Sequence, residues 1–249
     1  MKAEEIKKVV KDSYGQLAQQ SSGCGCKCSC GSDTSQVISK SIGYSDEEMS
    51  AVPEANMGLG CGNPIAISKI KSGNIVLDLG SGAGFDAFLA AKKVGETGKV
   101  IGVDMTQEMI VKATILANKY KYYNVEFKLG EIENLPIDDN SIDIIISNCV
   151  INLAPDKLKV FKEAYRVLKQ GGRMYISDIV LLESLSEEQR NDENLIAGCV
   201  GGAILKDDYI KIVEQSGLQV NILGENKEIS KVQYQGLPLE SLSLEIIKK

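Results

Sequence analysis

The sequence contains no histidine among its 249 residues, and this absence excludes several kinds of site. A histidine-based catalytic triad, a histidine general base and a histidine metal ligand are all impossible in this chain. Any site for a soft metal or metalloid must therefore be built from sulfur, with carboxylates as the poorer alternative.

Long apolar runs and basic stretches are also missing. No run of about 18 apolar residues occurs, so no membrane span is predicted. The opening stretch, MKAEEIKKVVKD, is charged and lacks an apolar signal core, which argues against secretion and for a cytoplasmic protein. The net charge of −6 and the lack of a basic stripe argue against a nucleic-acid partner.

Cysteine, in contrast, is plentiful, with seven residues in the chain. In a reducing compartment these thiols stay reduced, so metal, metalloid or catalytic roles outrank structural disulfides. Four of them lie in the polar, glycine-rich stretch SSGCGCKCSCGSDTS, which is typical of a loop: Cys24, Cys26, Cys28 and Cys30. The other three stand far apart among small residues: Cys61 in GLGCGNP, Cys149 in SNCV and Cys199 in AGCVGGA.

From residue 73 onward, apolar strands alternate with helices. Strands are predicted over 74–79, 99–104, 125–129, 141–147, 173–178, 218–223 and 242–247, and helices over 85–93, 106–120, 155–169, 184–203 and 206–217. This pattern predicts an α/β fold with a mostly parallel, seven-stranded sheet and helices on both faces. The last two strands follow one another without a helix, so we expect an antiparallel C-terminal edge strand.

Local signals refine this outline. A helix over residues 1–20 precedes the cysteine-rich stretch, and a further helix starts at Ser45. We therefore divide the chain into an N-terminal helix with a cysteine-rich segment, 1–45, and a main domain, 46–249. Gly171 and Gly172 are the predicted stop of the helix over 155–169. The segment SEEQ predicts a capped helix start at Ser186.

The first strand of the main domain ends in a glycine loop, DLGSGAG, over residues 78–84. The dinucleotide pattern G-x-G-x-x-G fails at Phe85, and the G-K-[ST] ending of a phosphate-binding loop is absent, so neither pyrophosphate nor triphosphate is favoured. Asp104 ends the second strand about 20 residues later, where a carboxylate can take both hydroxyls of a ribose. A purely structural strand-to-helix turn is the alternative.

The loop resembles motif I of the S-adenosylmethionine (SAM) methyltransferases of Rossmann-like fold. The resemblance implies that the loop cradles the amino-acid part of SAM, while Asp104 holds the ribose. It implies further cofactor contacts at the adenine and around the site. The cofactor-binding residues implied are Tyr14, Asp78, Gly80, Ser81, Gly82, Asp104, Met105, Ile132, Glu133 and Asn148.

Cys149 and Cys199 occupy positions from which they could meet a ligand. Cys149 follows the fourth strand, on the edge of the sheet where open α/β sheets bind ligands. Cys199 lies in the excursion after the fifth strand, around 181–206, which suits a substrate cover. The alternatives are a buried core cysteine for Cys149, a helix-packing residue for Cys199 and a plain turn residue for Cys61.

Together, GLGCGNP, SNCVINL and AGCVGGA around DLGSGAG resemble the arsenite SAM methyltransferases, with Tyr14-Gly15 and Tyr44-Ser45 in keeping. The resemblance implies that Cys61, Cys149 and Cys199 are the catalytic thiolates that bind trivalent arsenic. It also implies that Cys61 forms a disulfide during turnover, with thioredoxin or glutathione as reductant, and that the activity detoxifies arsenic. Cys24, Cys26, Cys28 and Cys30 could gather arsenite, hold another metal or be accessory.

The bonding preferences of trivalent arsenic are consistent with a site of three thiols. Trivalent arsenic is thiophilic and takes three ligands in a pyramid, which leaves its lone pair exposed for methylation without a general base. Two other functions stay open from the residues alone. One is a SAM methyltransferase of another small molecule, such as a quinone precursor, and the other is a thiol protein that binds a metalloid without transferring a methyl group.

Overall fold

The computed structural model describes residues 1–19, 32–234 and 236–249. Seven strands of this part of the chain form one sheet in the order β3-β2-β1-β4-β5-β7-β6. The strands are β1 (Ile75–Leu79), β2 (Lys99–Asp104), β3 (Val125–Leu129), β4 (Ile142–Asn148), β5 (Leu168–Leu181), β6 (Gln219–Asn226) and β7 (Leu239–Ile247). The predicted α/β sheet is confirmed. The C-terminal strand β7 is antiparallel, as predicted, but it is not the edge strand, because it pairs with β5 on one side and with the outermost strand β6 on the other.

The strand order reverses between β1 and β4, and this arrangement sets the position of the site. β1 pairs in parallel with β2 on one side and with β4 on the other. Chains leaving these strands therefore diverge and leave a crevice at their carboxyl ends, the usual ligand position in open α/β sheets.

The central strands are apolar on both faces because helices cover both. On β1, Val76 belongs to the core beneath α5, and Leu77 belongs to the core beneath α7 and α10. The helices are α1 (Ala3–Gln19), α2 (Ser32–Ser41), α3 (Asp46–Ala51), α4 (Pro64–Ile67), α5 (Phe85–Val94), α6 (Gln107–Lys119), α7 (Lys157–Val167), α8 (Glu187–Arg190), α9 (Glu193–Ala197), α10 (Lys206–Gln215) and α11 (Glu228–Gln233), with 3₁₀ turns η1 (Pro53–Ala55) and η2 (Ile151–Leu153).

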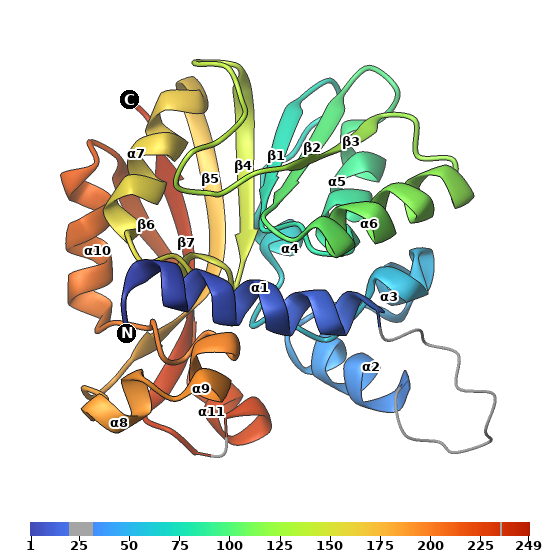
Figure 1. Ribbon diagram of the computed structural model, residues 1–249. Helices are drawn as coiled ribbons and strands as arrows, with labels where there is room; N and C mark the ends of the chain where they lie inside the picture. The colour runs from blue at the N-terminus through green and yellow to red at the C-terminus, as the bar shows by residue number, and fades with distance from the viewer. Residues whose placement is uncertain (20–31, 235) are drawn as a thin grey trace.

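Helix α1 lies across the carboxyl edge of the sheet. Figure 1 shows it passing below the carboxyl end of β4, and it packs against α6 and α9. The predicted helix starts at Ser45 and Ser186 are confirmed, since both residues form capping boxes. Within the described ranges, each helix is too short or too polar to cross a lipid bilayer.

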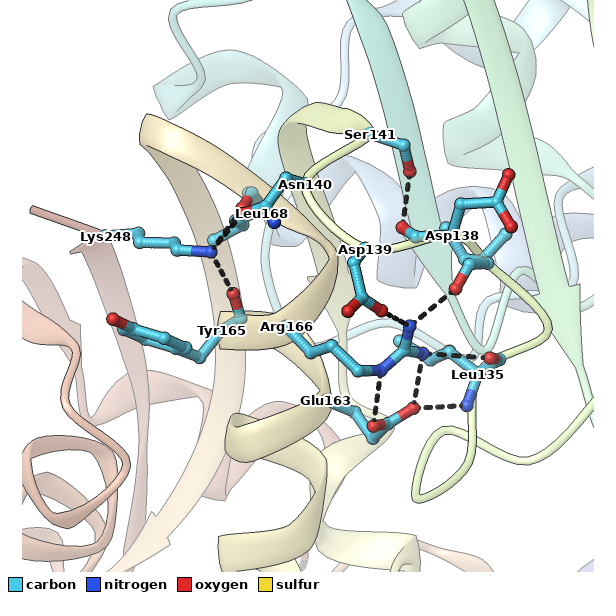
Figure 2. A network of polar contacts seen from close by, with 11 residues as sticks. Leu135, Asp138, Asp139, Asn140, Ser141, Glu163, Tyr165, Arg166, Leu168 and Lys248 are labelled. Atoms are coloured by element: carbon cyan, nitrogen blue, oxygen red, sulfur yellow. Dashed lines mark hydrogen bonds and ion pairs between the residues drawn. The ribbon is translucent and has the colours of Figure 1, made fainter.

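The predicted glycine stop of the helix over 155–169 is wrong. Helix α7 ends at Val167, and Gly171 and Gly172 lie within β5. Carbonyl groups at the end of the helix are instead satisfied by a lysine from the far end of the chain. Lys248 Nζ donates to the carbonyl oxygens of Tyr165 and Leu168, both at 2.7 Å (Figure 2).

A neighbouring arginine fixes the loop that leads into β4. Arg166 donates to the carbonyl oxygens of Ile137 and Leu135 at 2.7 and 3.1 Å, and it forms a bidentate pair with Glu163. Figure 2 shows this network beside that of Lys248. Because a bidentate guanidinium pair is geometrically specific, it holds the entry to β4 in one place.

Two further expectations need correction. The helix predicted over 184–203 is in fact the two short helices α8 and α9, and the chain turns after Ala197. At Gly202 an added Cβ would lie 2.0 Å from the carbonyl oxygen of Asn152, so the backbone there packs too closely for a regular helix with side chains. The last two strands, predicted to follow one another directly, are joined by α11, whose Ile229 is buried.

Candidate functional site

A cavity opens at the carboxyl edge, between the ends of β1 and β4. Its walls come from α1, the glycine loop, the ends of β2 and β4 and the loop after β3. All ten predicted cofactor-binding residues line it: Tyr14, Asp78, Gly80, Ser81, Gly82, Asp104, Met105, Ile132, Glu133 and Asn148.

The glycine loop requires glycine for two different reasons. Gly80 has φ +62°, and an added Cβ would lie 2.2 Å from Cγ2 of Val150. Gly82 has φ +51°, and an added Cβ would meet no atom within 4 Å. Gly80 therefore permits close packing, whereas Gly82 leaves open space at the cavity wall.

Asp104 is held in a fixed orientation at the end of β2. Its Oδ2 accepts from the amide of Gly82 at 2.9 Å, and its Oδ1 accepts from the amide of Thr106 at 2.8 Å. Burial raises the pKa of Asp104, although both amide bonds act in the opposite direction. Each oxygen keeps a further lone pair, so the carboxylate can accept from two hydroxyl groups.

Asp78 carries an unsatisfied acceptor. Its side chain is 3% exposed, and Oδ2 has no hydrogen-bond partner among the residues that the structure describes. Burial, then the charges of Asp86 and Asp104, raise its pKa well above the usual range. A buried oxygen of this kind is costly unless a ligand donates to it, and a cationic amino group would satisfy both needs.

A polar network missed in the sequence links the cavity to Cys61. Tyr44 donates to Asp86 at 2.6 Å, and Asn148 Nδ2 donates to the other Asp86 oxygen at 3.1 Å. Asn148 Oδ1 accepts from the amide of Cys61 at 3.0 Å, and Nδ2 donates to the carbonyl of Gly62 at 2.9 Å. Asn148 therefore ties the Cys61 loop to the end of β4. Asp86, two positions after Gly84, was the one feature of the sequence that could have indicated this network.

The structure brings Cys61, Cys149 and Cys199 together next to the cavity. All three are buried, with exposures of 1%, 3% and 2%, and Cys149 lines the cavity. Cys199 Sγ donates to the carbonyl oxygen of Cys149 at 2.7 Å, and Cys61 Sγ donates to that of Ser177 at 3.3 Å. The four N-terminal cysteines, Cys24, Cys26, Cys28 and Cys30, lie outside the described residues.

Two of the three cysteines have a strained backbone. Cys149 has φ +58° and Cys199 has φ +66°, and among the described non-glycine residues only Lys121 and Asn140 share this left-handed conformation. The conformation costs a non-glycine residue about 1–2 kcal/mol. Such strain persists only where the surroundings enforce it, and it gathers at functional sites.

The buried setting keeps the thiols protonated. Burial raises the pKa of Cys61. The hydrogen bond with the Cys149 thiol and burial raise that of Cys199 well above the usual range. For Cys149 a bond with Cys199 lowers the pKa, but the bond with Cys61 and burial outweigh it and leave the pKa well above normal. Deprotonation must therefore accompany ligand binding.

Further polar side chains surround the thiols: Tyr14, which was predicted to bind the cofactor, and Tyr234 and Asp178, which were missed in the sequence. Tyr234 Oη lies 3.8 Å from Cys149 Sγ, and Tyr14 Oη lies 3.9 Å from Cys199 Sγ. A carboxylate oxygen of Asp178 and the sulfurs of Cys61 and Cys149 all lie within 4.8 Å of one another. Nothing in the spacing of Tyr234 or Asp178 marks them in the sequence, because α11 and β5 reach the site only through the fold.

Helix α1 closes the outer side of the cavity. Lys7 pairs with Glu131 at 2.8 Å and with Glu133 at 2.5 Å, and Glu133 also accepts from the amide of Asp156 at 2.9 Å. Burial opposes the charge on Lys7, yet these bonds raise its pKa to about 12. The ion pairs join α1 to the loop that carries Ile132 and Glu133.

The fold, the glycine loop and the acid at the end of β2 define a Rossmann-like methyltransferase domain, and residues 70–217 match the family model described as a methyltransferase domain. An arsenite methyltransferase of Halobacterium salinarum is 43% identical over 87% of this chain and 58% of its own length. The arsenite methyltransferase of Homo sapiens is 36% identical over 92% of this chain and 64% of its own length.

A solved structure of an arsenic methyltransferase is also similar to this chain. The arsenic(III) S-adenosylmethionine methyltransferase of Chlamydomonas reinhardtii is 34% identical, with a TM-score of 0.66, over 82% of this chain and 74% of its own. The chain belongs to the arsenite SAM methyltransferase family, within the methyltransferase-domain family. It spans 58% and 64% of the length of the archaeal and human relatives.

Proposed function

We propose that this protein transfers a methyl group from SAM to trivalent arsenic held by the thiolates of Cys61, Cys149 and Cys199. The observation that carries the proposal is the convergence of three buried thiols from distant parts of the chain, next to the cavity that Cys149 lines. Family membership supports both the cofactor and the substrate.

The cavity residues fit SAM. The unsatisfied oxygen of Asp78 suits the cationic amino group, and Asp104 suits the two ribose hydroxyls. Met105 and Ile132 offer apolar surface for the adenine, while Glu133 anchors that wall to α1. Tyr14, Gly80, Ser81, Gly82 and Asn148 complete the binding surface. When bound, SAM supplies an electrophilic methyl group on a sulfonium sulfur.

The thiols supply the substrate site. Three sulfur ligands satisfy trivalent arsenic and leave its lone pair uncovered, so the arsenic itself is the nucleophile and no proton has to be removed from it. The contribution of the protein is to position the arsenic against the methyl group, and the strained backbones of Cys149 and Cys199 serve this positioning. The excursion around 181–206 contributes Cys199 and acts as the cover over the substrate.

A thiol reductant, thioredoxin or glutathione, completes the proposed cycle. Methyl transfer to the lone pair raises arsenic from the trivalent to the pentavalent state. Cys61, which we assign to a transient disulfide, and a second thiol then give arsenic two electrons and return it to the trivalent state. The reductant converts the resulting disulfide back to thiols. This chemistry requires a reducing environment, so we propose a cytoplasmic location and a role in arsenic detoxification.

The direct test is to incubate the protein with SAM, arsenite and a thiol reductant and to separate the arsenic species by chromatography with elemental detection. We expect methylated arsenic that depends on SAM. Arsenite that binds tightly but stays unmethylated would favour a sequestering protein instead. If arsenite neither binds nor reacts, the thiols are packing residues and the substrate is another small molecule.

Two variants separate the roles of the two halves of the site. Cys149→Ser should abolish methylation and leave SAM binding within about twofold. Asp104→Ala should weaken SAM binding by at least about tenfold, since it removes a charged acceptor, yet leave arsenite binding intact. Retained arsenite turnover in Cys149→Ser, or unchanged SAM affinity in Asp104→Ala, would contradict the assignment.

A further inference from the structure

We propose that Asp178 completes, with Cys61, Cys149 and Cys199, a four-donor site for a thiophilic divalent cation such as zinc. The carboxylate oxygen of Asp178 and the sulfurs of Cys61 and Cys149 lie within 4.8 Å of one another, and all three residues are buried. Cys199 is the neighbouring thiol, since its Sγ donates to the carbonyl oxygen of Cys149 at 2.7 Å, and we assign it as the third sulfur.

The donor set suits zinc in number and kind. Zinc in proteins is usually bound in a tetrahedron by thiolates at about 2.3 Å and carboxylates at about 2.0–2.2 Å. Adjacent donors in such a tetrahedron lie about 3.5–3.8 Å apart. The donors of Cys61, Cys149 and Asp178 therefore need to approach one another by little more than about 1 Å, while the Cys199 side chain has to turn from the carbonyl oxygen of Cys149 toward them.

Asp178 keeps one oxygen with capacity for a further ligand. Its Oδ1 accepts from Asn152 at 3.0 Å and from the amide of Ile179 at 3.0 Å, and its Oδ2 accepts only from Tyr209, at 3.0 Å, among the described groups. An oxygen that is oriented by other hydrogen bonds and keeps a free lone pair is the usual form of a metal-binding carboxylate.

The charges around the cluster are also compatible with a dication. Three thiolates and a carboxylate carry four negative charges, of which a divalent cation neutralises two. Lys157 is buried beside the cluster, close enough to act electrostatically on Asp178 and Cys199, and its ammonium offsets part of the remainder. A cation would enter through the cavity, since Cys149 lines it.

Asp178 is the group that should distinguish zinc binding from arsenite binding. Trivalent arsenic takes three sulfur ligands and leaves a lone pair, so it needs no carboxylate, whereas a tetrahedral cation uses the fourth donor. Zinc and arsenite should therefore compete for the same thiols but depend differently on Asp178. The competition rests on the proposed function, whereas the cation site rests on the four side chains alone.

The experiment uses the full chain with Cys24, Cys26, Cys28 and Cys30 changed to serine, so that those thiols contribute no signal. The reduced protein is titrated with Co²⁺ under anaerobic conditions, and thiolate-to-cobalt charge-transfer absorption reports binding. Zinc is then added to displace the cobalt and give its affinity. Arsenite affinity is measured separately by equilibrium dialysis with elemental detection.

Asp178→Asn keeps the shape of the side chain and should lower zinc affinity by about tenfold or more, with arsenite affinity unchanged within about threefold. Asp208→Asn, a surface carboxylate paired with Lys211, is the control and should change neither affinity. Zinc affinity that is equal in Asp178→Asn and its parent would overturn the assignment of Asp178. Absence of a charge-transfer band in the parent would overturn the site itself.

A second measurement covers the case in which Asp178→Asn does not fold, as judged by loss of SAM binding. X-ray absorption at the zinc edge of the parent protein should give three sulfur neighbours and one oxygen. A shell with fewer sulfurs, or with sulfur alone, would exclude the proposed ligand set. If zinc binds as expected but arsenite does not, the proposed function fails and the cation site stands.

Discussion

At the scale of single residues, the strained backbone of Cys149 leads us to predict that two inactive variants differ in stability. With φ +58°, Cys149→Gly relieves strain that Cys149→Ala keeps, so the glycine variant should be more stable than the alanine variant by about 1 kcal/mol. Both variants should lack methylation activity. Urea unfolding of the two variants gives the difference.

Cys61 provides the matched control, because it is absent from the residues with positive φ. There glycine should be less stable than alanine, since glycine gains more freedom on unfolding. The same ordering of the two substitutions at both positions would show that strain at Cys149 does not contribute.

The buried carboxyl group of Asp86 leads us to predict that the stability of the protein depends on pH. Burial raises its pKa to about 6 in the folded protein, although bonds from Tyr44 and Asn148 lower it. Its folded pKa lies above the unfolded value of 3.8, so the stability it contributes is present below about pH 4 and is lost as the pH rises through about 6. Each pKa unit corresponds to about 1.4 kcal/mol, which limits the loss to about 3 kcal/mol.

The measurement compares the wild type with Asp86→Asn by urea unfolding between pH 4 and pH 8. The free energy of unfolding of the wild type should fall relative to the variant over this range, because only the wild type must ionise the buried carboxyl group of Asp86. A difference between the two proteins that does not change with pH would show that Asp86 titrates normally.

The sequence reveals some of these residues and not others, for physical reasons. Asp104 and the glycine loop stand at strand ends, where period and spacing mark them, and the cysteines stand in motifs shared with the family. Asp178 and Tyr234 carry no such mark, because β5 and α11 approach the thiols only after the sheet has formed. Burial of Asp86 against Tyr44 is likewise a tertiary contact.

At the scale of elements, the strongest sequence patterns predict the fold most closely. β2 and β3 have the predicted bounds, because their apolar runs end at polar or glycine-rich turns. The errors lie where tertiary contacts decide: Lys248 satisfies the end of α7 in place of a glycine, and close packing of Gly202 on Asn152 ends the helical region after α9.

Helix α1 leads to a prediction at this scale, since Lys7 joins it to Glu133, on the side of the cavity that we assign to the adenine. Lys7→Met leaves the carboxylate of Glu133, which is 7% exposed, without its cation. We expect faster release of SAM, by up to about tenfold, which corresponds to about 1.4 kcal/mol. Stopped-flow displacement of bound SAM by excess S-adenosylhomocysteine measures the rate.

Lys11→Met is the matched control on the same helix. Lys11 pairs with Glu131 at 3.5 Å, and both side chains are about 40% exposed, so the pair contributes little. Release rates that are equal in the two variants would mean that the ion pairs of α1 do not hold the cavity closed.

At the scale of the whole molecule, the thiol site joins segments that are far apart in the chain. Cys61 precedes the sheet, Cys149 follows β4 and Cys199 follows α9. A single arsenic bound by all three closes two long loops, and because the unfolded chain cannot present the same pyramid, arsenite should stabilise the folded state. This effect does not depend on methyl transfer.

We therefore expect arsenite to raise the melting temperature in the absence of SAM. At one hundred times the dissociation constant the stabilisation is about 2.7 kcal/mol, which for a chain of this size amounts to roughly 5–10 °C. Differential scanning calorimetry with and without arsenite measures it. Changing Cys24, Cys26, Cys28 and Cys30 together to serine should preserve the increase, whereas Cys149→Ser should remove most of it. An increase retained in Cys149→Ser and lost in the fourfold variant would place the arsenic on the N-terminal cysteines, and the cavity would then have to act on a different substrate.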